Sequence, residues 1–256
     1  MVITTPFQVR RPPPSLFRLY HTQFAVPMTC ESCIKDIKGS LSQLGGIQKV
    51  EASLKDQLVT IEGTTAPSAI VRAIEATGRD AILRGSGSTD SAAVCILETH
   101  DQTVSDKVRG LVRMVQVSPS LTLFDLTIRG LQEGKYWATI REAGDISNGA
   151  ISTGGLWKGE DADKPKGVLG AVTVGKNGMG SVFLDKPIKI WEMIGRGMVV
   201  SRQHEGDQKF EKNDENTLVG VIARSAGVWD NDKTVCSCSG KTLWQERKDE
   251  VSKGML

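Results

Sequence analysis

The chain has 256 residues, with 32 lysines and arginines against 30 aspartates and glutamates, 39% hydrophobic residues and 27 glycines. The net charge is small and charges of one sign do not form long runs, so the sequence gives no indication of nucleic-acid binding. No run approaches the roughly 18 apolar residues of a membrane span. The length allows two domains with a tail, and the abundant glycines favour turns and short strands over a helical bundle.

Residues 1–18 form a basic extension. No aspartate or glutamate precedes Cys30, and the extension carries Arg10, Arg11 and Arg18 around the helix-breaking run Pro12-Pro13-Pro14. A disordered extension and an incorrectly extended start both fit this composition. A mitochondrial transit peptide is a further alternative, because such segments are rich in arginine and poor in acids, although the triple proline counts against it.

Residues 19–84 predict an α+β domain of order βαββαβ, a ferredoxin-like sandwich. Hydrophobic periodicity and turn residues define its elements. The predicted strands are Leu19–Val26, Ile47–Ser53, Leu58–Glu62 and Ala81–Arg84, and the predicted helices are Ser32–Gln43 and a segment from Pro67 to Gly78.

Residues 85–91 are rich in glycine and serine and predict a linker that lets the first domain move. Residues 92–226 then predict an all-β sandwich or barrel, because many short strands are separated by turn residues. The candidate strands are Ala92–Thr99, Val108–Val117, Thr122–Arg129, Tyr136–Arg141, Ala171–Val174, Ser181–Leu184, Met198–Ser201 and Leu218–Ala223. Residues 227–256 form a polar, mostly irregular tail in which Thr242–Val251 could be a short helix.

The MTCESC motif at Met28–Cys33 places two thiols in a loop directly before the first predicted helix. The positive end of the helix dipole lowers thiol pKa and favours thiolate, the soft ligand that Cu(I) prefers. Transferable Cu(I) on Cys30 and Cys33 is the favoured interpretation. A thioredoxin-like redox pair and half of a structural zinc site completed by Cys236 and Cys238 stay open as alternatives.

On these residues, the first domain resembles the copper-carrying domains of metallochaperones and copper-pumping ATPases, whose hallmark is MTCxxC after the first strand. The chain has the full hallmark, Met28–Cys33, in a domain of matching order. The resemblance implies that Cys30 and Cys33 hold Cu(I) in an open site.

The second domain resembles Cu/Zn superoxide dismutase, a Greek-key β-barrel. Ala93–Leu97 is similar to its first strand, Arg141–Asp145 to the segment where copper histidines precede a Gly-Asp turn, and Ile194–Arg196 and Gly220–Ile222 to its late strands. That enzyme holds its two metals with several histidines and an aspartate. The whole chain has three histidines, which are His21, His100 and His204.

Alignment with the family places other residues at the ligand positions. These are Thr139, Arg141 and Ser201 for copper and Val168 for the zinc aspartate, with Asn216 near the substrate-steering arginine and Ala150 and Val219 at the disulfide cysteines. The resemblance therefore implies a dismutase scaffold without zinc and without dismutase activity. Cys95 is predicted to be a buried apolar residue on a strand rather than a ligand.

The second cysteine pair, Cys236 and Cys238, is separated by one residue in the tail. A disulfide across this spacing is strained and therefore oxidising, and the two thiols could also bind or pass Cu(I). An incidental pair is the alternative. Gly220–Trp229 and Cys236–Arg247 are similar to the end of the copper chaperones for Cu/Zn superoxide dismutase, and the loss of ligands resembles their fungal branch.

This family resemblance implies a metallochaperone rather than an enzyme. Cys30 and Cys33 would load Cu(I), the barrel would dock onto an immature dismutase subunit as a heterodimer, and Cys236 and Cys238 would complete copper transfer or disulfide formation. It also implies a copper importer as the copper source, and the cytoplasm and mitochondrial intermembrane space as locations. The pair that makes the final transfer, and whether the isolated chain is a homodimer, stay open.

Overall fold

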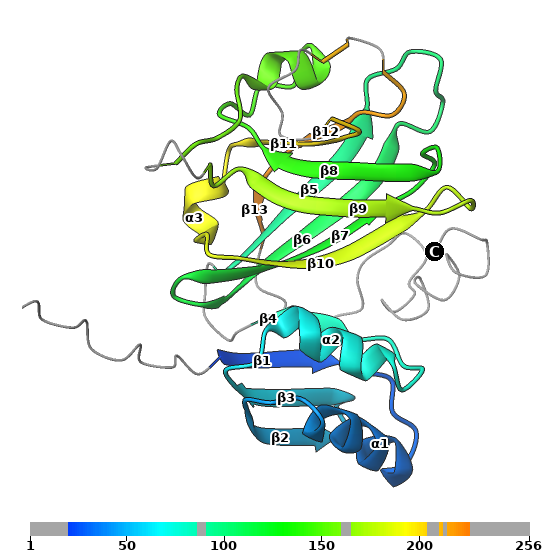
Figure 1. Cartoon of the computed structure of the whole chain (residues 1–256), viewed down its shortest axis with the longest axis vertical. Helices are drawn as coiled ribbons and strands as arrows, with labels where there is room; N and C mark the ends of the chain where they lie inside the picture. Colours follow the sequence, from blue (N-terminus) through cyan, green and yellow to red (C-terminus); the bar gives the residue numbers. More distant parts are fainter. Residues whose placement is uncertain (1–19, 86–90, 160–164, 204–209, 212–213, 226–256) are drawn as a thin grey trace, which may run out of the picture.

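The computed structural model describes residues 20–85, 91–159, 165–203, 210–211 and 214–225. These residues form a small α+β domain and a larger β-barrel, which are in contact (Figure 1). The predicted fold class is confirmed. No helix within the described ranges is long and apolar enough to cross a membrane.

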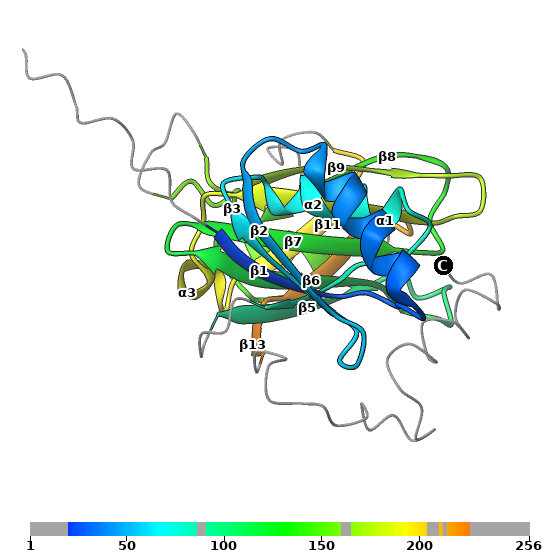
Figure 2. The ribbon, with the colours of Figure 1, turned by 90° about the horizontal axis from the view of Figure 1, so that it is seen from below.

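The small domain has the predicted βαββαβ order. Its strands β1 (Tyr20–Ala25), β2 (Ile47–Ser53), β3 (Leu58–Gly63) and β4 (Ile82–Gly85) form an antiparallel sheet in the spatial order β2-β3-β1-β4. Two helices, α1 (Glu31–Ser42) and α2 (Pro67–Glu75), contact each other and lie side by side in Figure 2.

Local sequence explains where the two helices lie. In α1 the buried residues Cys33, Ile37 and Leu41 recur every four positions, so they share the face that covers the sheet. In α2, Pro67 occupies the first helical position, where its missing N–H and restricted φ are tolerated. Gly78 follows the end of α2 with a φ of +77°, a conformation that favours glycine.

The barrel is a nine-stranded antiparallel sheet with the order β10-β7-β6-β5-β12-β11-β8-β9, in which β13 also pairs with β5. Strands β9 and β10 contact each other, so the sheet nearly closes. The strands are β5 (Ala92–Thr99), β6 (Val108–Ser118), β7 (Leu121–Ile128), β8 (Gly134–Ile140), β9 (Val168–Val174), β10 (Gly180–Lys186), β11 (Gly197–Ser201), β12 (Leu218–Val221) and β13 (Ala223–Ser225).

Two short helices of the barrel were not predicted, the 3-10 helix η1 (Gly149–Thr153) and α3 (Ile190–Met193). Neither spans enough residues to show a helical period in the sequence. The first amide of α3, that of Ile190, donates to Gln116 Oε1 on β6 at 3.0 Å. A contact between distant segments therefore helps to set where α3 begins.

The predicted strand Leu218–Ala223 is divided in the structure. Ile222 separates β12 from β13, and its backbone groups bond to the turn before β11 instead of to the sheet. Its N–H donates to the Arg196 carbonyl at 2.9 Å, and its carbonyl accepts from the Gly195 N–H at 2.8 Å. The prediction was wrong at this residue because the competing hydrogen bonds come from a different part of the chain.

One outer face of the barrel is covered by the small domain. Along β6, Val112 and Met114 point into the barrel core, whereas Val115 and Val117 point outward and join the core cluster of the small domain. Leu123 of β7 lies opposite Val115 and is fully buried in the same cluster. These strands are thus apolar on both faces because one face packs inside the barrel and the other packs on the small domain.

A polar contact accompanies this apolar interface. The N-cap residue of α2, Ala66, has no side chain that can bond to the free amides of the first turn. Instead, the carboxylate of Asp185 on β10 accepts hydrogen bonds from the Ser68 hydroxyl and, at 3.4 Å, from the Ser68 N–H. A carboxylate of the barrel therefore caps a helix of the small domain, where it also interacts favourably with the helix dipole.

Several predicted segments lie outside the described residues. They are the extension 1–18, most of the linker 85–91, and all of the tail 227–256 with its predicted helix Thr242–Val251. The two domains that the linker joins are packed against each other in the described arrangement.

Candidate metal-binding site

Cys30 and Cys33 lie where the loop after β1 leads into α1. Cys30 has an extended backbone (φ −158°, ψ 170°) and precedes the first helical residue, while Cys33 lies in the first turn. Cys30 is exposed, Cys33 is 6% exposed, and their sulfur atoms are 3.6 Å apart. The structure thus brings the predicted pair together at the positive end of the α1 dipole.

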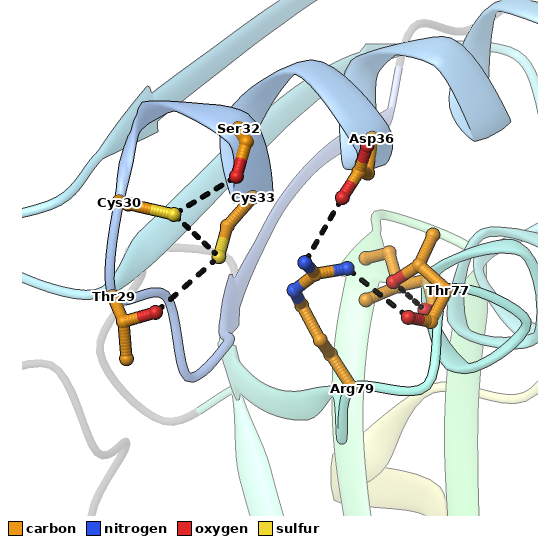
Figure 3. A network of polar contacts seen from close by, with 8 residues as sticks. Thr29, Cys30, Ser32, Cys33, Asp36, Thr77 and Arg79 are labelled. Atoms are coloured by element: carbon orange, nitrogen blue, oxygen red, sulfur yellow. Dashed lines mark hydrogen bonds and ion pairs between the residues drawn. The ribbon is translucent and has the colours of Figure 1, made fainter.

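Hydrogen-bond donors surround the Cys33 sulfur (Figure 3). The backbone N–H of Thr29 lowers the pKa of the Cys33 thiol most, followed by the guanidinium of Arg79 and the hydroxyl of Thr29, whose Oγ1 lies 3.6 Å from the sulfur. The pKa falls from 9.0 to about 6. Because these donors favour the charged form, Cys33 is mainly thiolate at neutral pH.

The Cys30 thiol also has a lowered pKa. The largest cause is the Ser32 hydroxyl, whose Oγ lies 2.9 Å from the Cys30 sulfur, and the backbone N–H of Cys33 acts in the same direction. The neighbouring Cys33 side chain opposes this shift. The exposed sulfur of Cys30 is therefore the one that an approaching ligand or thiol meets first.

Arg79 belongs to this site, although the sequence analysis did not identify it. Its Nη2 lies 3.1 Å from Asp36 Oδ2 on α1, and its Nη1 donates to the Thr77 carbonyl at 3.1 Å (Figure 3). These contacts hold the guanidinium beside Cys33. The hydrogen bond to the Cys33 sulfur is the largest cause of a raised pKa of Arg79.

Topology could have identified Arg79. The sheet pairs Ala25 at the end of β1 with Ile82 at the start of β4. The loop that leaves β1 and the loop that enters β4 therefore lie at the same end of these two neighbouring strands. A cation directly before the last strand of a βαββαβ domain is thus expected near a CxxC motif that follows the first strand.

The described residues contain no group of three or more His, Cys, Asp or Glu side chains that could hold a metal ion. Cys30 and Cys33 form an open pair of soft donors with a cation beside it. Such a pair suits a soft metal of low coordination number and leaves room for an incoming ligand.

In the barrel segments that resemble dismutase ligand segments, the side chains bond to protein groups. Arg141 is 3% exposed, its Nη2 donates to the Gly154 carbonyl at 2.8 Å, and its guanidinium carbon lies 5.0 Å from the centre of the Phe210 ring. Buried Thr139 donates to the Val199 carbonyl at 3.3 Å, and buried Ser201 accepts the N–H of Gln203 at 3.2 Å. These side chains form protein contacts instead of a metal-ligand set.

Positions aligned with the dismutase disulfide also meet in space. Ala150 of η1 and Val219 of β12 belong to one small apolar cluster with Val199 and Phe210. Apolar packing therefore surrounds both aligned positions. Asn216 accepts the hydroxyl of buried Tyr136 at 2.9 Å, so its side chain is part of the barrel framework.

The remaining predicted residues of the barrel are structural where they are described. Cys95 is fully buried on β5, and burial raises the pKa of its thiol to about 12, as expected for an apolar role. Val168 is the first residue of β9, opposite Thr139. His100 is half-buried and lies against Gly149, while His204 lies outside the described residues.

The second cysteine pair, Cys236 and Cys238, also lies outside the described residues. The structure therefore tests neither its position nor its relation to Cys30 and Cys33. Its role, and the alternative of a zinc site shared by both pairs, stay predictions.

The fold and site define a class of protein: a thiol-based metal carrier domain joined to a barrel of the dismutase type. Comparisons with known proteins agree with both parts. Residues 23–80 match the heavy-metal-associated domain family, and residues 108–226 match the copper/zinc superoxide dismutase family.

Full-length relatives combine the same two domains. The chain is 43% identical to the superoxide dismutase 1 copper chaperone of Saccharomyces cerevisiae, over 91% of this chain and 96% of that protein. It is 44% identical, with the same coverage, to the protein of that name from Debaryomyces hansenii. It is 36% identical to the copper chaperone for superoxide dismutase of Homo sapiens, over 88% of each chain. The chain belongs to the family of copper chaperones for superoxide dismutase.

Proposed function

We propose that this chain carries Cu(I) on Cys30 and Cys33 and delivers it to a Cu/Zn superoxide dismutase. The observation that supports this most is the open pair of sulfur atoms, 3.6 Å apart, with Cys30 exposed. Two thiolates are soft ligands and suit Cu(I), and an exposed sulfur lets an acceptor thiolate form a bond to the metal before the donor leaves.

Arg79 would adjust the charge of the loaded site. Two thiolates with one monovalent copper ion carry one net negative charge, and the guanidinium beside Cys33 offsets it. The Thr29 N–H and the Ser32 hydroxyl would stabilise the same charge by hydrogen bonding. These groups favour copper over protons on the sulfur atoms at neutral pH.

The barrel would serve as the docking domain for the dismutase subunit in a heterodimer. Dismutase subunits form dimers, and a barrel of the same type can present a corresponding surface. Three exposed large apolar side chains are candidates for contacts with the dismutase subunit: Ile96 on β5 (56% exposed), Ile151 in η1 (44%) and Trp191 in α3 (67%). A homodimer of the chain through the same surface competes with this arrangement.

The dismutase-like barrel would hold neither copper nor zinc of its own. Arg141, Thr139 and Ser201 are buried and bonded to backbone groups at positions aligned with metal ligands. A buried guanidinium also repels a metal cation at that place. Superoxide turnover by the purified chain, free of any dismutase, would contradict this part.

Cys236 and Cys238 would complete activation of the target, by passing copper, by forming its intrasubunit disulfide, or both. In the disulfide route, a target thiolate attacks the Cys236–Cys238 disulfide and releases one of these cysteines as a thiol. The second target thiol then attacks the mixed disulfide, so the target gains a disulfide and both tail cysteines leave as thiols. Two electrons pass from the target to the tail, and the strain of a CxC disulfide favours this direction.

The proposed setting follows the family. A copper importer would supply the metal, and the chain would act in the cytoplasm, with the mitochondrial intermembrane space as a second location. Fractionation of cells followed by detection of the chain tests both compartments.

The decisive experiment mixes the Cu(I)-loaded chain with reduced, metal-free dismutase under oxygen. We expect dismutase activity and the target disulfide to appear together, and the metal-free chain to give no activity. Metal analysis that found tightly bound zinc and no Cu(I) affinity would favour a structural zinc protein instead. No gain in activity or disulfide would refute the proposed function.

The two cysteine pairs should differ in effect. Replacing Cys30 and Cys33 with serine should abolish tight Cu(I) binding at the first domain. When copper is plentiful, activation should suffer less from that change than from replacing Cys236 and Cys238. The opposite order would mean that the assigned roles are reversed.

A further inference from the structure

The turn between β2 and β3 contains an unusual residue, Gln57. Ser53 pairs with Leu58, so residues 54–57 form the turn, and contacts between Ser53 Oγ and Asp56 close it. Gln57 has a φ of 54° and is the one non-glycine residue with positive φ in the described part of the chain. Glycine or asparagine adopts this conformation more easily, so the glutamine side chain requires an explanation.

Gln57 holds the loop that leads to Cys30 at two points. Its carbonyl accepts the N–H of Val26 at 2.9 Å, and its Nε2 donates to the carbonyl of Met28, also at 2.9 Å. These bonds lie on either side of Pro27, which has no N–H of its own to anchor the loop. Met28 is 2% exposed, so the loop is held both by the buried thioether side chain and by the glutamine amide.

The second bond acts on the peptide group next to the site. The carbonyl of Met28 and the N–H of Thr29 belong to one planar unit and point in opposite directions. The carbonyl accepts from Gln57 Nε2 at 2.9 Å, while on the other side Thr29 Oγ1 lies 3.6 Å from the Cys33 sulfur and the Thr29 N–H lowers the pKa of that thiol. The orientation that Gln57 gives to this plane is therefore the orientation that directs the Thr29 N–H at Cys33.

We propose that Gln57 is a positioning residue of the Cu(I) site, which orients the Met28–Thr29 peptide toward Cys33 through its side-chain amide. The unfavourable backbone conformation is retained because it places this amide on the Met28 carbonyl. The part that concerns copper rests on the proposed function, whereas the orientation of the peptide can be measured without metal.

The test uses Gln57→Gly and Gln57→Ala in the full chain, with Cys236 and Cys238 replaced by serine so that Cu(I) titrates only the first pair. Both variants lose the amide, but glycine relieves the backbone strain and alanine does not. The matched control is Gln23→Ala, which removes a glutamine bond to Thr60 Oγ1 (3.3 Å) in the same sheet without touching the loop.

We expect both Gln57 variants to bind Cu(I) roughly tenfold more weakly than the parent chain, measured by competition with a chromogenic Cu(I) chelator. Gln57→Gly should melt at a higher temperature than Gln57→Ala, although the two lose the same affinity. If Gln57 only stabilised the turn, Cu(I) affinity would instead follow the melting temperature of each variant. Gln23→Ala should keep the affinity of the parent.

Hydrogen exchange of the Thr29 amide in the metal-free chain provides the second measurement. Loss of the Gln57 amide should speed this exchange relative to the parent and to Gln23→Ala. Unchanged exchange together with Cu(I) affinity within about twofold of the parent would overturn the proposal. The proposal also fails if affinity falls only in proportion to melting temperature. If the parent chain binds no Cu(I), the proposed function fails, while the Thr29 exchange still decides whether Gln57 positions the peptide.

Discussion

Arg79→Met removes the guanidinium beside Cys33 and keeps a long aliphatic side chain in its place. The guanidinium is the second-largest cause of the lowered pKa of Cys33, after the Thr29 N–H, so the pKa should rise above about 6 and stay below 9.0. At pH 7 a thiol with a pKa of about 6 is about 90% thiolate, whereas one with a pKa of 9.0 is about 1% thiolate. The thiolate fraction at neutral pH should therefore fall.

The assay is the rate at which iodoacetamide alkylates Cys33, followed by mass spectrometry from about pH 5 to pH 9. A Cys30→Ser background leaves one reactive thiol in the loop, and each variant is compared with the parent in that background. The midpoint should move to higher pH in Arg79→Met, with slower alkylation at pH 7.

Asp36→Asn is the matched control, because it removes the ion pair at 3.1 Å but leaves the guanidinium bonded to the Thr77 carbonyl. The midpoint should move less in this variant than in Arg79→Met. If the Arg79→Met curve coincides with that of the parent, the guanidinium does not stabilise the thiolate, and the electrostatic role assigned to Arg79 is wrong.

Three further predictions concern the domain interface, the docking surface and pH. Asp185→Ala should lower the free energy of unfolding by about 1 kcal/mol, and Ser68→Ala should lower it by no more, because the Ser68 N–H can still bond to Asp185. The double variant should lose no more than Asp185→Ala, and additive losses in denaturant titrations would contradict the shared contact. Ile96→Glu should weaken association with dismutase in sedimentation experiments while changing stability by less than about 0.5 kcal/mol, since this side chain is 56% exposed; unaltered association would place docking elsewhere. Cu(I) affinity should fall as pH drops through about 6, because protons then compete for the Cys33 sulfur; an affinity independent of pH between about 5 and 7 would exclude this competition.

Much of the fold could be predicted from local sequence patterns. The strands Ile47–Ser53 and Ala92–Thr99 agree residue for residue with β2 and β5, because turn residues mark both ends of each segment. The helix predicted at Ser32–Gln43 agrees with α1 within one residue, since its apolar period and Gly45-Gly46 are local features. Segments that depend on distant partners were predicted less well, as the division at Ile222 and the helix α3 show.

The same division applies to the site. Cys30 and Cys33 were found from the chain because their spacing and the helix that follows lie within one short segment. Arg79 and Gln57 were not found, because they precede β4 and β3, two other strands of the sheet. Strand pairing with β1 brings these strand ends to the loop that carries the cysteines. Their side chains have no distinctive spacing relative to the cysteines.

The sequence by itself determined the two domain types and the thiol pair, because each is encoded by residue identity and short-range period. The tertiary structure decided three further properties. It packed the small domain on the outer face of β6 and β7, it supplied the Asp185 cap to α2, and it placed Arg79 and the Gln57 amide around the metal loop. All three are contacts between residues far apart in the chain, whose partners are set only when the strands pair and the two domains meet.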